Sequence, residues 1–92
     1  MKGKTASLRR TVRLAAGYQL QTAPPGSGGV LVSPKGPIPL NETATMILDL
    51  CNGTYTVEEI VAHVLSARGD SLEQDVRAFL DAALRRGWVV EN

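Results

Sequence analysis

The side chains best suited to catalysis are few and scattered along this chain of 92 residues. It contains one histidine, His63, and one cysteine, Cys51. A zinc site or a cysteine–histidine nucleophile needs several such groups at defined spacing. We expect His63 to lie on the surface, off the apolar stripe of its helix, and Cys51 to be a buried apolar side chain without a disulfide partner. The sequence therefore predicts no enzyme activity, no metal and no cofactor.

Two further features suggest ligand chemistry but have simpler explanations. Glu58 and Glu59 fall at the start of a predicted helix, where acidic side chains complement the helix dipole. The glycine-rich segment GSGG, residues 26–29, lacks both the lysine and the following helix of a phosphate-binding loop. Neither feature predicts an active site.

The composition is that of an ordinary soluble globular protein, with 43% hydrophobic and 21% charged residues. The length suits one domain with its own core. We find no apolar run of about 18 residues to cross a bilayer, and the basic N-terminus lacks the apolar segment of a secretory signal. We therefore expect a cytoplasmic protein without a membrane partner.

The charges divide the chain into two parts. Residues 1–13 carry five basic side chains and no acid, and we interpret them as a flexible basic tail. Residues 14–92, the predicted single domain, hold five basic and nine acidic side chains. Binding to a phosphate backbone depends on lysine and arginine, so an acidic domain is a poor partner for nucleic acid.

The segment LDLCNGTYTVEEIV, residues 48–61, ends one helix and starts another, as in a DNA-binding helix-turn-helix. The helix predicted over Val57 to Ala67 has two acids and no lysine or arginine, and the next helix begins with Glu73 and Asp75. Neither resembles a recognition helix, so we expect no nucleic-acid binding. Two alternatives stay open: a DNA-binding winged-helix regulator and a homo-oligomeric structural module.

The first half of the predicted domain has the pattern of strands. Tyr18 to Thr22 alternates apolar and polar residues, a flexible loop covers residues 23–29, and Val30 to Ser33 is β-branched and apolar. Ser33-Pro34-Lys35-Gly36 suits a type I turn, so Gly36 to Leu40 should return as a partner strand. Its prolines, Pro37 and Pro39, direct their missing amides to the same side, which predicts a sheet edge.

Everything after Leu40 has the pattern of helix. Three helices are expected between caps and glycines: from Asn41 to Gly53, from Thr56 to Gly69 and from Ser71 to Gly87. Thr56 with Glu59, and Ser71 with Gln74, have the spacing of capping boxes. The apolar Trp-Val-Val that follows should pack on the core or add a short strand. The predicted fold is α+β, a three-stranded antiparallel sheet followed by three helices, arranged like a winged helix.

The segments VLVSPKGPIPLNETATMILDLCNGTYTVEEIVAHV and LEQDVRAFLDAALRRGWV resemble the PqqD family over about Arg13 to Val90. Two positions depart from the family pattern: Lys35 stands where an acid is common, and Asn52 where aspartate is usual. Both are turn positions and bear on local charge more than on the fold. The resemblance rests on these motifs: Pro34-x-Gly36, Leu40-Asn41-x-x-Ala44, Ile47-Leu48-x-Leu50-Cys51-x-Gly53, Thr56-Val57-x-x-Ile60, and Asp75-Val76-x-x-Phe79-Leu80 with Gly87.

The resemblance implies a non-catalytic protein that binds the precursor peptide PqqA and presents it to PqqE, a radical S-adenosylmethionine enzyme, in pyrroloquinoline quinone (PQQ) biosynthesis. Such domains, called RiPP recognition elements, take the peptide as an extra strand beside their third strand and third helix. Independently, an edge strand is where a peptide adds by β-augmentation. We expect a monomer or weak homodimer. The candidate peptide-binding residues are Gly36, Pro37, Ile38, Pro39 and Leu40 on the strand, and Arg77, Leu80, Asp81 and Leu84 on the helix.

Overall fold

The computed structural model describes residues 10–24 and 27–92, which form an α+β domain. No helix within these ranges is long and apolar enough to cross a membrane. In chain order the elements are β1 (Thr11–Leu14), β2 (Gln19–Gln21), β3 (Val30–Ser33), β4 (Gly36–Pro39), α2 (Glu42–Asp49), β5 (Asn52–Thr56), α3 (Val57–Arg68), the 3-10 turn η1 (Asp70–Leu72), α4 (Glu73–Arg85) and β6 (Val89–Glu91).

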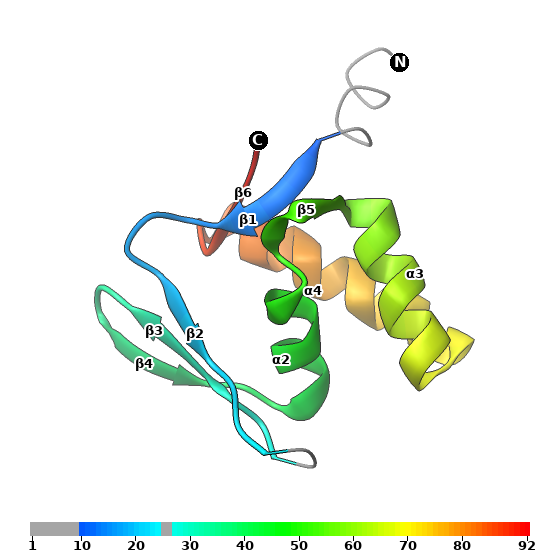
Figure 1. Ribbon diagram of the computed structural model, residues 1–92, viewed down its shortest axis with the longest axis horizontal. Coiled ribbons are helices and arrows are strands. Elements are labelled where there is room, and N and C mark those ends of the chain that lie inside the picture. The colour runs from blue at the N-terminus through cyan, green and yellow to red at the C-terminus, as the bar shows by residue number, and fades with distance from the viewer. Residues whose placement is uncertain (1–9, 25–26) are drawn as a thin grey trace.

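The strands make two separate antiparallel sheets, each with three strands. The hairpin sheet has the order β2-β3-β4 and is built from strands that follow one another in the chain. The terminal sheet has the order β5-β1-β6, and its central strand pairs Arg13 with Asn52 on one side and Val12 with Glu91 on the other. In Figure 1 the hairpin sheet lies at the left, α3 lies at the right, and α2 lies between them.

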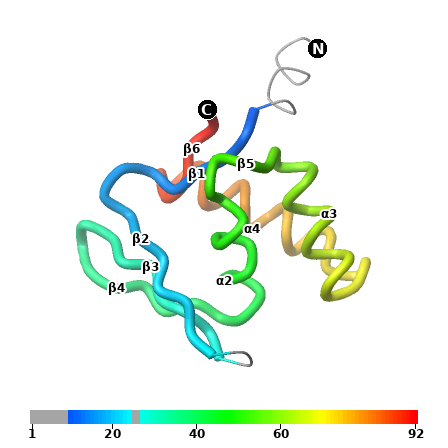
Figure 2. The backbone as a smooth tube through the Cα atoms, in the orientation of Figure 1, coloured from blue at the N-terminus to red at the C-terminus, as the bar shows by residue number. Residues whose placement is uncertain are grey.

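The hairpin sheet agrees with the sequence-based prediction, whereas the terminal sheet was not predicted. Strands β2, β3 and β4 lie where expected, but the prediction of helix everywhere after Leu40 is wrong, because residues 52–56 form β5. The predicted boundary of the basic tail is also displaced, since β1 begins at Thr11. Most of that tail, residues 1–9, lies outside the described residues. Figure 2 shows β1 and β6 side by side at one end of the molecule.

Two of the three predicted helix caps form in the structure, and the third does not. The Asn41 side chain accepts a hydrogen bond from the Ala44 amide at 2.7 Å, and Thr56 with Glu59 forms the predicted capping box of α3. The capping box predicted at Ser71 is absent, because Asp70–Leu72 forms a 3-10 turn and α4 starts directly after it, at Glu73, without a side-chain cap.

One core joins all the layers. Cys51 is 2% exposed and donates its S–H to the Ile47 carbonyl, and burial raises the pKa of its thiol to about 12. This confirms the buried cysteine expected from sequence. His63 is exposed, as expected, with its ring 4.8 Å from that of Tyr55. The largest fully buried side chains are Leu31, Ile47, Leu48, Ile60, Leu80, Val12, Val64, Val76 and Val89.

A tight contact holds the hairpin sheet against the start of α2. The Thr45 hydroxyl accepts a hydrogen bond from the Gly29 amide and donates one to the Asn41 carbonyl, each at 2.8 Å. A side chain at Gly28 would place its Cβ 1.7 Å from the Leu40 carbonyl oxygen, so only glycine permits this approach. The end of β4 is thereby positioned beside the N-terminus of α2.

Candidate functional site

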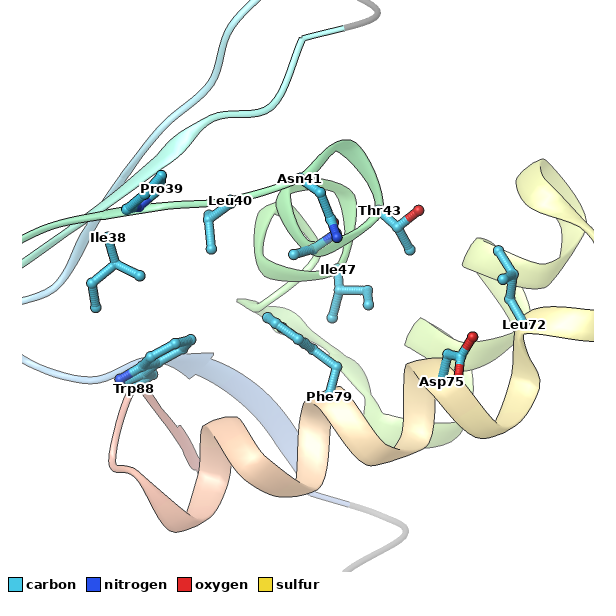
Figure 3. A pocket seen from close by; sticks show the side chains of 11 residues that line it. Ile38, Pro39, Leu40, Asn41, Thr43, Ile47, Leu72, Asp75, Phe79 and Trp88 are labelled. Atoms are coloured by element: carbon cyan, nitrogen blue, oxygen red, sulfur yellow. The ribbon is translucent and has the colours of Figure 1, made fainter.

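A groove of about 440 Å³ lies where the end of β4, the start of α2 and the side of α4 meet. Figure 3 shows the strand and α2 on one wall and α4 on the other, with Trp88 at one end. The groove is partly open to solvent. Its lining residues are Ile38, Pro39, Leu40, Asn41, Thr43, Ala44, Ile47, Leu72, Asp75, Phe79 and Trp88.

One end of the groove is aromatic and apolar. Ile38 extends from β4 toward Trp88, and Phe79 projects from α4 beside it (Figure 3). The rings of Phe79 and Trp88 meet edge to face, with centroids 6.3 Å apart, and the Arg86 guanidinium lies 5.5 Å from the centre of the indole. These contacts hold two half-exposed aromatic side chains in place, ready to bury an apolar group.

The other end of the groove carries polar side chains beside Leu72 (Figure 3). Asp75 and the Thr43 hydroxyl lie there with the Asn41 side chain, whose oxygen is already used to cap α2 (Figure 3). Within residues 10–24 and 27–92, no three histidine, cysteine, aspartate or glutamate side chains are grouped to hold a metal ion. The groove therefore offers apolar contact and hydrogen bonds to a ligand.

Strand β4 forms one side of this groove and is the outer strand of the hairpin sheet. The Leu40 amide donates to the Gly29 carbonyl at 2.9 Å, so Leu40 directs its backbone groups toward the neighbouring chain. Backbone direction alternates along a strand, so Ile38 does the same and Pro37 and Pro39 direct theirs to the free side. The edge strand predicted from the two prolines is confirmed.

The helix part of the predicted site is not confirmed. Leu80 is 1% exposed and belongs to the core, and Arg77 is bound to Glu58 of α3 by two hydrogen bonds of 2.7 and 2.9 Å. Asp81 pairs with Arg85, and Leu84 packs against the core. None of these four side chains lines the groove.

The groove instead uses the face of α4 and η1 that carries Leu72, Asp75 and Phe79. At 100° per residue, Phe79 lies far around the helix from Arg77 and Leu84. The apolar stripe identified the side that faces the core, but it did not identify the edge that faces β4. The sequence feature that could have identified the groove is Trp88, the only tryptophan, which directly follows the glycine that ends the helix.

Comparison with known proteins agrees with this architecture. The family model described as coenzyme PQQ synthesis protein D (PqqD) matches residues 28–89. A protein of Methylococcus capsulatus named PqqA binding protein is 44% identical over 64 residues, covering 67% of this chain and 68% of its own length. One of the same name from Stutzerimonas stutzeri is 40% identical, covering 79% of this chain and 82% of the relative.

Among solved structures, the heterocyclase TruD contains a similar fold, with a TM-score of 0.69 and 21% identity. The likeness covers 90% of this chain but only 12% of the heterocyclase, so it concerns one small part of a larger protein. A second heterocyclase structure, in complex with substrate and cofactor, aligns over 90% of this chain with a TM-score of 0.66.

Fold and groove together define a small α+β domain with an open sheet edge beside an apolar cleft, a class suited to holding an extended peptide. The chain belongs to the PqqD family, coenzyme PQQ synthesis protein D.

Proposed function

We propose that this protein binds the precursor peptide PqqA in PQQ biosynthesis, without catalysing a reaction on it, and presents it to the radical S-adenosylmethionine enzyme PqqE. The peptide adds as a strand along Gly36 to Leu40 and places apolar side chains between Ile38, Phe79 and Trp88. We also propose that the protein is a cytoplasmic monomer or weak homodimer and that it binds neither nucleic acid nor membrane. Its fold, in this proposal, is winged-helix-like.

One observation carries the proposal: a free strand edge lies directly beside an apolar groove. Backbone hydrogen bonds give an added strand its alignment, and the pockets beside the strand select its side chains. The relatives named PqqA binding protein support PqqA as the occupant. The presentation to PqqE rests on the family resemblance alone.

The groove is expected to supply most of the affinity. A net backbone hydrogen bond contributes about 0.5–1.5 kcal/mol, whereas burying one large apolar side chain contributes about 1.5–3 kcal/mol. Ile38 and Phe79 are both half-exposed in the free protein, so each has apolar area left to bury. An apolar residue of PqqA seated between them is therefore the main anchor.

The charges of the helices support a peptide rather than nucleic acid. Glu58 and Glu59 occupy the first turn of α3, and Glu73 and Asp75 the first turn of α4. Acidic side chains at these helix starts repel a phosphate backbone. Nucleic-acid binding instead requires lysine and arginine side chains, which neutralise the phosphates.

The test is a titration of isotope-labelled protein with PqqA, followed by NMR. We expect shifts concentrated on Ile38, Leu40, Phe79 and the Trp88 indole, with the exposed side of α3 around His63 unchanged. As a matched pair, Ile38→Lys should weaken binding, because the lysine places a charge in the apolar end, whereas His63→Glu should not. Shifts centred on α3, or no binding at all, contradict the proposal.

A further inference from the structure

We propose that the free edge of β4 accepts hydrogen bonds but donates none, so that it takes a foreign strand only through that strand's N–H groups and rejects the β4 of a second copy. This inference rests on the proposed function for the identity of the foreign strand. The part that concerns self-pairing stands on the edge alone.

The register of the hairpin sheet places the two prolines on the outward side. Pro39 pairs with Val30 and Pro37 with Val32, while Ile38 lies opposite Leu31 between them. The bond from the Leu40 amide to Gly29 fixes which residues point inward, and Ile38 shares that direction. The outward backbone groups of β4 are therefore those of the two prolines, which have carbonyls but no N–H.

On the turn side of β4, the next donor along the edge is already engaged. At the turn, the Lys35 amide donates to the Ser33 hydroxyl oxygen at 3.2 Å, and that hydroxyl donates to the Gly36 carbonyl at 2.7 Å. An ordinary edge alternates donors and acceptors. This one presents two acceptors, on residues two apart, and an arriving strand must supply two N–H groups with the same spacing.

The same geometry separates foreign strands from a second copy. When two β4 strands meet edge to edge, both offer carbonyls at the proline positions and neither offers an N–H. Those ladder positions stay unpaired, so the main source of alignment for a strand-mediated dimer is missing. A precursor peptide with ordinary amides meets no such obstacle, so the edge stays available for it.

The first experiment scans PqqA with single amide-to-ester replacements, using wild-type protein. An ester removes the N–H of one residue, and the carbonyl that it also alters points to the other side of the strand. We expect two sensitive positions, two residues apart, each weakening binding about 2- to 10-fold, with the ester between them having little effect.

Each outcome of this scan bears on a different claim. If intact PqqA binds but no ester position weakens it, the one-way edge is refuted while the proposed function stands. If intact PqqA does not bind, the proposed function itself fails.

The second experiment restores the donors with the double variant Pro37→Val and Pro39→Val, and measures mass against concentration by sedimentation. We expect the folded double variant to self-associate at least tenfold more tightly than wild type. The matched control is Pro34→Ala, in the exposed turn, which should behave as wild type. A folded double variant that self-associates no more than wild type refutes the self-pairing part. So does a wild-type dimer that dissociates when PqqA is added.

Discussion

Two faces of α4 contact different parts of the molecule. One face carries Val76, Leu80 and Ala83, each no more than 1% exposed, and closes the core. The other carries Asp75 and Phe79, which line the groove beside β4. A third strip, on the opposite side of the core face from Phe79, carries Arg77, whose guanidinium joins α4 to Glu58 of α3. If the groove binds the peptide as proposed, stability and binding depend on different side chains of one helix.

This difference shows why an amphipathic pattern locates a core more easily than a site. The apolar stripe of α4 is visible because burial needs a nearly continuous row of apolar residues. A groove needs only a few side chains at the margin of that stripe, and which margin depends on where the neighbouring strand passes. The sequence-based choice of Arg77, Leu80, Asp81 and Leu84 followed the stripe and its far margin.

The largest expected effect is on the core face. Leu80→Ala should lower the free energy of unfolding by about 2–5 kcal/mol, because it leaves a cavity beneath α4. PqqA affinity, measured where the variant is still folded, should be nearly unchanged. Urea unfolding followed by Trp88 fluorescence and a peptide titration measure the two quantities. A stable variant that has lost peptide binding would place Leu80 in the binding site and contradict the separation of the core face from the groove face.

The groove face should show the reverse. Phe79→Ala should weaken PqqA binding more than tenfold, since it removes an aromatic wall worth about 1.5–3 kcal/mol of apolar contact. Calorimetric titration measures the change, with circular dichroism to confirm the fold. Leu84→Ala is the matched control, because it shortens an apolar side chain of the same helix outside the groove. Equal losses for both variants would contradict the division of faces.

The smallest effect belongs to the strip that faces α3. The Arg77 guanidinium donates two hydrogen bonds to Glu58 and so lowers the pKa of that carboxyl. Both side chains are at least 40% exposed, and solvent screens the pair. Arg77→Met should therefore lower the free energy of unfolding by about 0.2–1 kcal/mol at neutral pH, and it should leave PqqA affinity unchanged.

The pH dependence of this contribution has a defined sign. The folded-state pKa of Glu58 lies below its unfolded value, so the pair stabilises the protein above the ordinary glutamate pKa. The contribution is lost as the pH falls through the lowered value. An NMR titration should show the pKa of Glu58 rising toward its ordinary value in Arg77→Met. An unshifted pKa would mean that the pair does not persist in solution.

The features that rest on local chemistry could be predicted from the sequence. The prolines at 37 and 39 specify an edge strand because they lack amides, and the structure places β4 at the edge of its sheet. Asn41 and Thr56 specify helix starts because their side chains satisfy free amides within three residues. The burial of Cys51 followed from helical spacing. Each of these signals acts within one turn or one hairpin.

The terminal sheet and the groove depend on contacts between segments that are distant in the chain. Strand β5 lies between two helices in the chain, and it is a strand because β1, some 40 residues earlier, provides its hydrogen-bond partner. The face of α4 that borders β4 likewise depends on how Gly28, Gly29 and Thr45 seat the hairpin sheet on α2. Partners so distant in sequence leave no local pattern, because propensity describes a segment alone whereas pairing and packing depend on what the fold brings beside it.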